Sequence, residues 1–460
     1  MRKLGLLCAL LLPLMGWAQS FVGHWGGEIT LPNTTLKIIY HIAKQGELYT
    51  ATMDIPQQGA WGIGVDLVTV KDGELNLDLR SINAMYRGKR VTDKRIDGYF
   101  TQYGTSFPLV LTPAEIEPVK RPQTPQPPFP YTEREVRFES RAVGVTLNGT
   151  LTLPTHTPRA AVILVTGSGL QNRNEELFSH QPFAVIADYL TRHDIAVLRY
   201  DDRGWDWNEE QRAKLVDCTT DDYTEDALGA LDFLAAELPH INIGILGHSE
   251  GGTIAFLAAA RDKRVGFIVS LAGSMLRGNE VMMDQTRTSL EGSGLPGDMV
   301  EKLMVAFGKV YTLAGEHPLD DLRAHAEEYR ATLKNDPLLA SFPQTLVDVV
   351  MRSYQTILNS GWLHHFVNSD PADAIRKSAH RPILALNGAM DIQVRGGKHL
   401  GRLKQLLPRS KHLATKIYPA TNHLFQPCTS GAVAEYATIE TTISEEVLAD
   451  IASWIEELPE

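Results

Sequence analysis

The 460-residue sequence contains little cysteine, no excess of positive charge and no long hydrophobic stretch. Its only cysteines are Cys8, Cys218 and Cys428, too few for a disulfide-rich scaffold. No segment approaches the roughly 20 uninterrupted apolar residues that a membrane-spanning helix needs. Lysine and arginine number 44 against 55 acidic residues, so the formal net charge is -11. An acidic chain without basic runs argues against nucleic acids and anionic membrane surfaces as partners.

Sequence signatures of metal sites are also missing. The chain contains neither H-E-x-x-H nor paired cysteines at the spacing of metal ligands. Those patterns are the usual sequence signals of zinc sites. We therefore predict that the protein needs no metal ion.

The N-terminal stretch MRKLGLLCALLLPLMGWAQS has the pattern of a cleaved export signal. Arg2 and Lys3 precede an apolar run that ends in small residues. We expect residues 1–18 to form a signal peptide, cut near Ala18, which would export the protein to the periplasm or the outside. Most of the apolar run follows Cys8, which disfavours a lipid anchor on that cysteine.

Two different composition patterns follow the signal. Residues 19–112 carry short strand-like runs such as TLKIIYHIA, LYTATMDI and FPLVLT, separated by turns that contain glycine. We expect a small antiparallel β domain there, either a barrel or a sandwich. Seven prolines then occur between Pro113 and Pro130. Because proline at this density prevents both helix and sheet, we predict an extended linker over residues 113–134.

Beyond this linker, apolar strand-like runs alternate with amphipathic helical segments. Runs such as AAVILVTG, DIAVLRYDD and INIGILGHS are continuously apolar, as is typical of parallel strands buried on both faces. The alternation predicts a doubly wound α/β core, a mostly parallel sheet flanked by helices, over residues 135–273 and 380–460. Residues 274–379 interrupt it with helical periodicity. We expect this insertion to form a helical cap over the site.

The segment GILGHSEGGTIAF places Ser249 between a predicted strand and a predicted helix. G-x-S-x-G in this setting is typical of a nucleophile elbow, where small neighbours accommodate a strained backbone. A serine hydroxyl needs a base, and in this fold an acid and then a histidine follow it along the chain. Asp391 and His423 each follow a later predicted strand. We predict Ser249 as nucleophile, Asp391 as acid and His423 as base.

Each of these assignments has a structural alternative. Ser249 could be an ordinary turn serine, Asp391 a helix N-cap, and His423 a loop histidine with its hydrogen bonds satisfied. His248 is expected to point away from Ser249. His399, on a predicted helix, is a weaker candidate for the base than His423.

The tetrahedral intermediate of acyl transfer needs two donors for its oxyanion. The first is predicted to be the backbone amide of Glu250, the residue after the nucleophile. The second should come from the loop VTGSGLQNRNEEL, whose glycines let the backbone approach a reacting carbonyl closely.

Five motifs resemble those of the bacterial α/β-hydrolase esterases of the EstD type. They are GSGLQNRNEEL, RYDDRG, GHSEGG, ALNGAMDIQV and NHLFQ, and the resemblance covers roughly residues 137–457. It implies a Ser-Asp-His carboxylesterase that acts on short-chain acyl esters of small molecules without a cofactor. Carried over position by position, the triad falls on Ser249, Asp391 and His423.

The resemblance also bears on the oxyanion donors. Family members commonly have proline, which lacks an N–H, at the position of Leu170. The second donor is therefore expected to be the amide of Ser168 or Gly169.

Cys218 and Cys428 should both lie near the carboxyl edge of the sheet, and a disulfide between them is predicted, with two free thiols as the alternative.

Two other functions remain open at this point. A peptidase, or another amide or thioester hydrolase of the same fold, would use the same triad. A glycan- or protein-binding module with an inactive hydrolase core would not need it.

Overall fold

The computed structural model describes most of the chain beyond its first twenty residues. The described ranges are 21–31, 34–45, 48–56, 60–79, 82–102, 104–115 and 119–459. The predicted signal peptide lies outside them. The chain divides into two compact units, Met1–Pro118 and Val119–Glu460. Within the described ranges, no helix is both long enough and apolar enough to cross a lipid bilayer.

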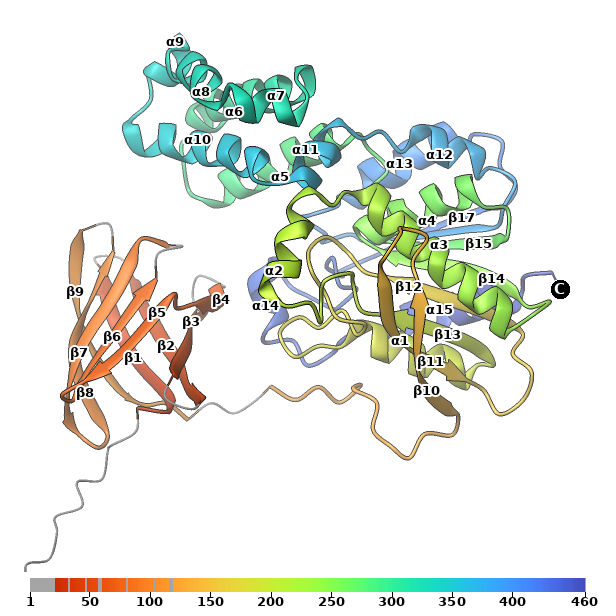
Figure 1. The fold of residues 1–460 in the computed structure, drawn as a ribbon, viewed down its shortest axis with the longest axis horizontal. Coiled ribbons are helices and arrows are strands. Elements are labelled where there is room, and N and C mark those ends of the chain that lie inside the picture. The colour runs from red at the N-terminus through yellow and green to blue at the C-terminus, as the bar shows by residue number, and fades with distance from the viewer. Residues whose placement is uncertain are drawn as a thin grey trace, which may run out of the picture. The chain divides into compact units, whose positions relative to one another are not determined.

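The described residues of the first unit form a nine-stranded antiparallel sheet (Figure 1). Its spatial order is β4-β3-β2-β1-β9-β8-β7-β6-β5, so the first and last strands are neighbours. Trp25, Tyr40, Leu77, Tyr86 and Phe100 are buried in its core, and exposed residues alternate with buried ones along β7. The strands are β1 (Gly23–Leu31), β2 (Thr34–Gln45), β3 (Leu48–Ile55), β4 (Ala60–Gly64), β5 (Leu67–Lys71), β6 (Glu74–Leu79), β7 (Ala84–Thr92), β8 (Arg95–Gln102) and β9 (Thr105–Pro113).

The second unit is built on an eight-stranded sheet within the described residues, in the order β10-β11-β13-β12-β14-β15-β16-β17. The pairs from β13 to β17 are parallel, whereas β10 and β11 pair antiparallel. Every residue of β12, β13 and β16 is buried, which explains their continuous apolar character. The strands are β10 (Thr132–Glu139), β11 (Thr146–Leu153), β12 (Ala160–Val165), β13 (Ile195–Tyr200), β14 (Asn242–His248), β15 (Val265–Leu271), β16 (Ile383–Gly388) and β17 (Leu413–Tyr418).

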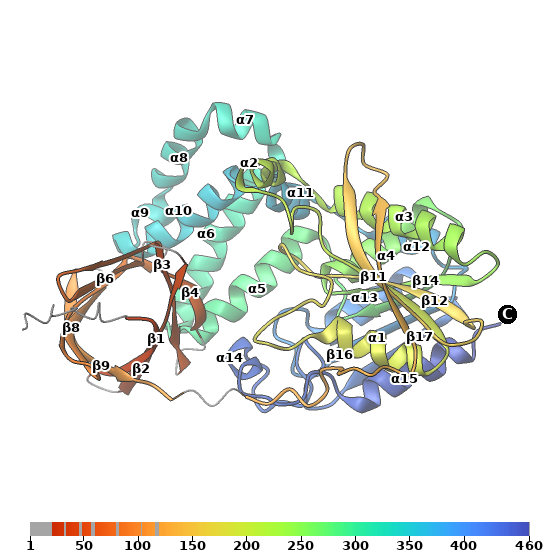
Figure 2. The ribbon, with the colours of Figure 1, turned by 60° about the horizontal axis from the view of Figure 1, so that its bottom comes forward.

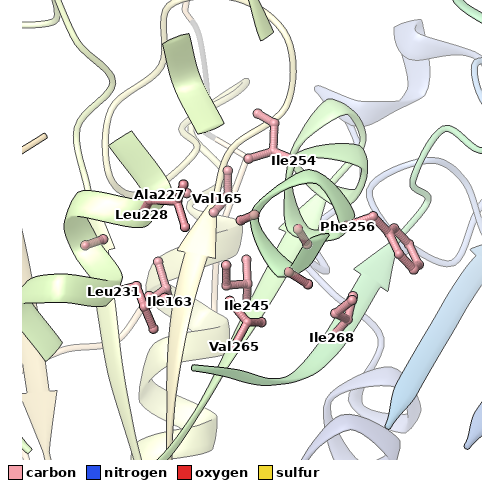
Figure 3. Packing of buried hydrophobic residues seen from close by; sticks show 14 of the residues in the cluster. Ile163, Val165, Ala227, Leu228, Leu231, Ile245, Ile254, Phe256, Val265 and Ile268 are labelled. Atoms are coloured by element: carbon pink, nitrogen blue, oxygen red, sulfur yellow. The ribbon is translucent and has the colours of Figure 1, made fainter. Parts of the chain in front are cut away.

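Helices cover both faces of this sheet. One face packs against α3 (Thr220–Glu237), α4 (Glu250–Arg261) and α13 (Gly396–Leu406), and the other against α1 (Pro182–Arg192) and α15 (Glu445–Glu456). Figure 3 shows the first layer, in which strand side chains meet leucines of α3 and Ile254 of α4. Full burial of such a side chain stabilises the fold by about 1.5–3 kcal/mol.

Most of the helices between β15 and β16 share a hydrophobic core of their own, whereas the last one, α12, packs into the core of the sheet. In Figures 1 and 2, α6 to α10 stand away from the sheet, whereas α5 and α11 lie nearer to it. The helices are α5 (Gly278–Gly292), α6 (Gly297–Glu316), α7 (Leu319–Ala324), α8 (Ala326–Lys334), α9 (Pro337–Ala340), α10 (Gln344–Leu358), α11 (Gly361–Asn368) and α12 (Ala372–Lys377).

The second half of the proline-rich segment is hydrogen-bonded to the rest of the second unit. The guanidinium of Arg121 donates hydrogen bonds to the carbonyl oxygens of Phe178, Ala437 and Ile439. Gln123 adds hydrogen bonds to the loop that precedes α15. Residues 119–131 therefore form a strap along this unit.

Candidate active site

Ser249 lies at the sharp turn from β14 into α4. Its backbone has φ 53° and ψ -118°, a conformation that residues with a side chain rarely adopt. The turn is packed too tightly for larger neighbours. A Cβ atom at Gly247 would lie 1.9 Å from the carbonyl oxygen of Gly251, and one at Gly251 would lie 2.1 Å from that of Val165. The glycines of GHSEGG are therefore required for this turn.

Asp391 and His423 form a buried pair. Nδ1 of His423 lies 2.7 Å from Oδ2 of Asp391, and the two side chains are 6% and 0% exposed. The other carboxylate oxygen, Oδ1, accepts from the amides of Gln393 and Val394, each at 2.8 Å. Because an ionised carboxylate only accepts, Nδ1 carries the imidazole hydrogen and Nε2 is left to take up a proton.

The loops that carry the predicted residues converge at one edge of the sheet. Strands β12, β14, β16 and β17 run parallel, so the segments after them meet at their carboxyl ends. The rings of His248 and His423 are 4.7 Å apart between centroids, which brings the turn before Ser249 against the histidine loop. A Cβ atom at Gly167 would lie 3.1 Å from that of Ser249, so the loop after β12 covers the serine.

The same loop contains the expected oxyanion donors. The amide of Gly167 donates to Oε1 of Glu175 at 3.0 Å, and the amide of Gln171 donates to Asp202 at 2.8 Å. The amides between them include those of the predicted Ser168 and Gly169. Glu250 begins α4, and amides in the first turn of a helix have no acceptor within the helix.

Parts of the chain match known hydrolases in sequence. A family model described as "Hydrolase_4: Serine aminopeptidase, S33" matches residues 157–365. Esterase EstD of Thermotoga maritima is 33% identical over 174 residues, which cover 36% of this chain and 40% of that protein. Monoglyceride lipase of Homo sapiens is 32% identical over 108 residues, or 23% of this chain and 32% of the lipase. The chain thus spans less than half the length of these relatives.

The resemblance to α/β-hydrolase esterases of the EstD type is confirmed. The region that matches the family model contains Ser249, but it ends before Asp391 and His423. Among solved structures, dienelactone hydrolase from Anabaena variabilis is 15% identical with a TM-score of 0.40, covering 72% of this chain and 100% of that one.

The carboxylate of Glu250 links the turn at Ser249 to the inserted helices. Its Oε1 accepts from Oγ1 of Thr220 at 2.6 Å and from Nε1 of Trp362, on α11, at 2.8 Å. Burial raises the pKa of Glu250, while the hydrogen bonds to Thr220 and Trp362 oppose that rise. Sequence reasoning considered only the amide of Glu250 and missed Trp362, because nothing near position 362 marks it as a partner of the elbow.

His248 points away from Ser249 and contacts two other loops. Its Nδ1 lies 2.8 Å from Oε1 of Glu175, and its Nε2 lies 3.0 Å from the carbonyl oxygen of His423. Burial opposes a charged ring, but the carboxylate of Glu175 outweighs this cost and the pKa of His248 is raised. Sequence analysis did not single out Glu175, although it stands within the motif GSGLQNRNEEL.

The remaining histidine candidate, His399, is bonded to the loop after β15. Its Nδ1 accepts a hydrogen bond from the amide of Met275 at 3.0 Å. Burial lowers the pKa of His399 to about 4, so the ring is neutral near pH 7. It supports the loop after β15 and does not supply the base.

The disulfide predicted between Cys218 and Cys428 is absent, because both cysteines are free thiols. Cys218 follows a short 3-10 helix, and its Sγ donates to the carbonyl oxygen of Lys214 at 3.8 Å. Cys428 sits in the loop after His423, where its amide donates to the carbonyl oxygen of Ala420. The prediction failed because it assigned both residues to one edge of the sheet without knowing the path of either loop.

Proposed function

We propose that the protein is a serine carboxylesterase that hydrolyses short-chain acyl esters of small molecules through an acyl-enzyme. The observation that carries this proposal is the 2.7 Å bond between His423 and Asp391, buried beside the strained turn that holds Ser249. An oriented imidazole next to a serine at such a turn has the chemistry of acyl transfer. The family match supports the class of reaction.

The reaction would proceed in two halves. Nε2 of His423 takes the hydroxyl proton of Ser249 while Oγ attacks the ester carbonyl carbon, and the amides of Glu250 and of Ser168 or Gly169 stabilise the oxyanion. The C–O bond to the alcohol then breaks, and His423 protonates the leaving oxygen. Water, deprotonated by His423, attacks the acyl-enzyme, and the acid departs with Oγ of Ser249 reprotonated. Asp391 holds the tautomer of His423 and stabilises its imidazolium form throughout.

Three further parts of the proposal concern the rest of the chain. The inserted helices act as a cap, since Nε1 of Trp362, on α11, donates a hydrogen bond to the carboxylate of Glu250, the residue after the nucleophile. The N-terminal sheet is an accessory β domain joined through the strap at residues 119–131. The apolar leader exports the protein, which places the reaction in the periplasm or outside the cell.

A second candidate function is hydrolysis of an amide at a peptide N-terminus. It is favoured by the description of the matched family model, serine aminopeptidase. The triad chemistry would be the same, and the leaving group would be an amine in place of an alcohol. Aminoacyl p-nitroanilides and p-nitrophenyl esters therefore form a matched substrate pair.

The deciding experiment compares the wild type with Ser249→Ala on p-nitrophenyl esters from acetyl to dodecanoyl and on the anilides. We expect turnover of the short esters by the wild type only, with kcat lower in the variant by roughly 10⁴-fold or more. A fluorophosphonate probe should label the wild type and not the variant. Preference for the anilides would favour the peptidase, and a wild type that is neither active nor labelled would favour the binding module.

A further inference from the structure

His248 has a hydrogen-bond acceptor at each of its ring nitrogens. Oε1 of Glu175 lies 2.8 Å from Nδ1, and the carbonyl oxygen of His423 lies 3.0 Å from Nε2. Neither a carboxylate nor a carbonyl oxygen can donate, so both nitrogens must carry hydrogens for both contacts to be hydrogen bonds. A ring with two N–H groups is an imidazolium. The side chains of His248 and Glu175 are 8% and 5% exposed, so this charged pair is buried.

Glu175 binds a second group with the same oxygen. Its Oε1 also accepts from the amide of Gly167 at 3.0 Å, at the start of the loop that carries the expected oxyanion donors. One buried ion pair thus holds two parts of the site at once. Glu175 holds the loop over Ser249 through the amide of Gly167, and His248 holds the carbonyl oxygen of His423, the proposed base.

We propose that Glu175 and protonated His248 form an ion pair that positions the oxyanion loop and His423 for catalysis, with His248 as a positioning imidazolium. This proposal rests on the esterase function proposed above. Burying an ion pair is costly unless its members are also well hydrogen-bonded, and here the pair makes hydrogen bonds to Gly167 and His423 as well. Removing one charge leaves the other buried and unpaired.

The arrangement makes the pair sensitive to alkaline pH. A neutral His248 keeps only one ring hydrogen, so it must release either Glu175 or the carbonyl of His423. The other titratable groups that face this pair are Asp391, the His423 ring and Asp202. Because the contacts with Glu175 and with the carbonyl oxygen of His423 raise the pKa of His248, the ion pair persists to a higher pH than an ordinary imidazolium would and is lost as the pH rises through that raised pKa.

The test uses Glu175→Gln, which keeps the shape and removes the charge, with Glu176→Gln as matched control at the exposed neighbouring position. We expect Glu175→Gln to lower kcat for p-nitrophenyl acetate by about 10- to 100-fold while KM changes less than about threefold. The alkaline limb of its kcat profile should move to lower pH, and Glu175→Asp should restore part of kcat. Glu176→Gln should match the wild type in each measurement.

A second measurement does not depend on activity. With ¹⁵N-labelled histidine, and His248→Gln used for assignment, both ring nitrogens of His248 in the wild-type protein should give mainly protonated signals at pH 6.5, where an ordinary imidazole is about half charged. Signals of a neutral ring at that pH would overturn the proposal, as would a kcat of Glu175→Gln equal to that of the wild type. A wild type that hydrolyses no ester would defeat the esterase assignment instead, and the ¹⁵N spectrum would still decide the ion pair.

Discussion

Nδ1 of His423 lies 2.7 Å from Oδ2 of Asp391, although the two residues are 32 positions apart in the chain. They meet because β16 and β17 are parallel neighbours in register, with Gly388 opposite Tyr418 at their carboxyl ends. Each residue stands a few positions beyond its strand, so both side chains come to the same edge of the sheet. The pair is thus a direct product of strand order and strand register.

Replacing Asp391 by Asn should disable the base without disturbing the loop. Asn retains an oxygen that can accept from the amides of Gln393 and Val394, but its NH₂ group would face Nδ1 of His423. His423 would then hold its hydrogen on Nε2, the wrong nitrogen for a base. We expect kcat to fall by about 10³- to 10⁴-fold. Steady-state kinetics beside a thermal melt would check this, and a variant with more than a tenth of wild-type kcat would contradict the role of Asp391.

Two glycines of this chain should respond to alanine in opposite directions. A Cβ at Gly251 would lie 2.1 Å from the carbonyl oxygen of Val165, so Gly251→Ala must displace either the nucleophile turn or β12. Gly401, inside α13, has no atom within 4 Å of its Cβ position. We expect Gly251→Ala to lower both the esterase activity and the free energy of unfolding. Gly401→Ala should raise the free energy of unfolding by about 0.5–1 kcal/mol. Urea melts of both variants would test this, and equal effects would contradict the packing argument.

Stability should fall as the pH drops below neutrality, in part because of His399. Its pKa is lowered to about 4 by burial, against about 6.5 in an unfolded chain. Between those two values the unfolded chain binds a proton that the folded protein excludes, so the free energy of unfolding decreases with falling pH. For this one group the loss at pH 5 is about 2 kcal/mol.

The matched variant for this prediction is His399→Gln. Its amide oxygen can accept from the amide of Met275, as Nδ1 of His399 does, but it does not titrate. Denaturant melts of both proteins between pH 5 and pH 7.5 should show a shallower pH dependence in the variant. Identical slopes would show that His399 does not exclude a proton.

Both cysteines of the second unit should react as thiols without prior reduction. Burial raises the pKa of Cys218 and of Cys428, so little thiolate forms near pH 7 and alkylation should be slow in the folded protein. Peptide mass spectrometry after alkylation in denaturant should find both residues modified with or without dithiothreitol. A reducible peptide pair that joins Cys218 to Cys428 would contradict the structure.

The sequence by itself determined the class of the second unit and the positions of the candidate triad. Strands buried on both faces are continuously apolar, and this pattern is visible without coordinates in AAVILVTG and INIGILGHS. Ser249, Asp391 and His423 were found because each stands just after such a run. The glycines of GHSEGG were also informative, because backbone contacts inside the turn leave no room for a Cβ atom.

Only the tertiary structure decided what surrounds these residues. Glu250 meets Trp362 across 112 positions, and His248 meets Glu175 across 73. Such contacts depend on where a loop or an inserted helix folds back onto the sheet. No local periodicity encodes that path, which is also why the disulfide predicted between Cys218 and Cys428 was wrong. Strand order sets the edge at which a side chain lies, whereas packing between distant segments sets its partner.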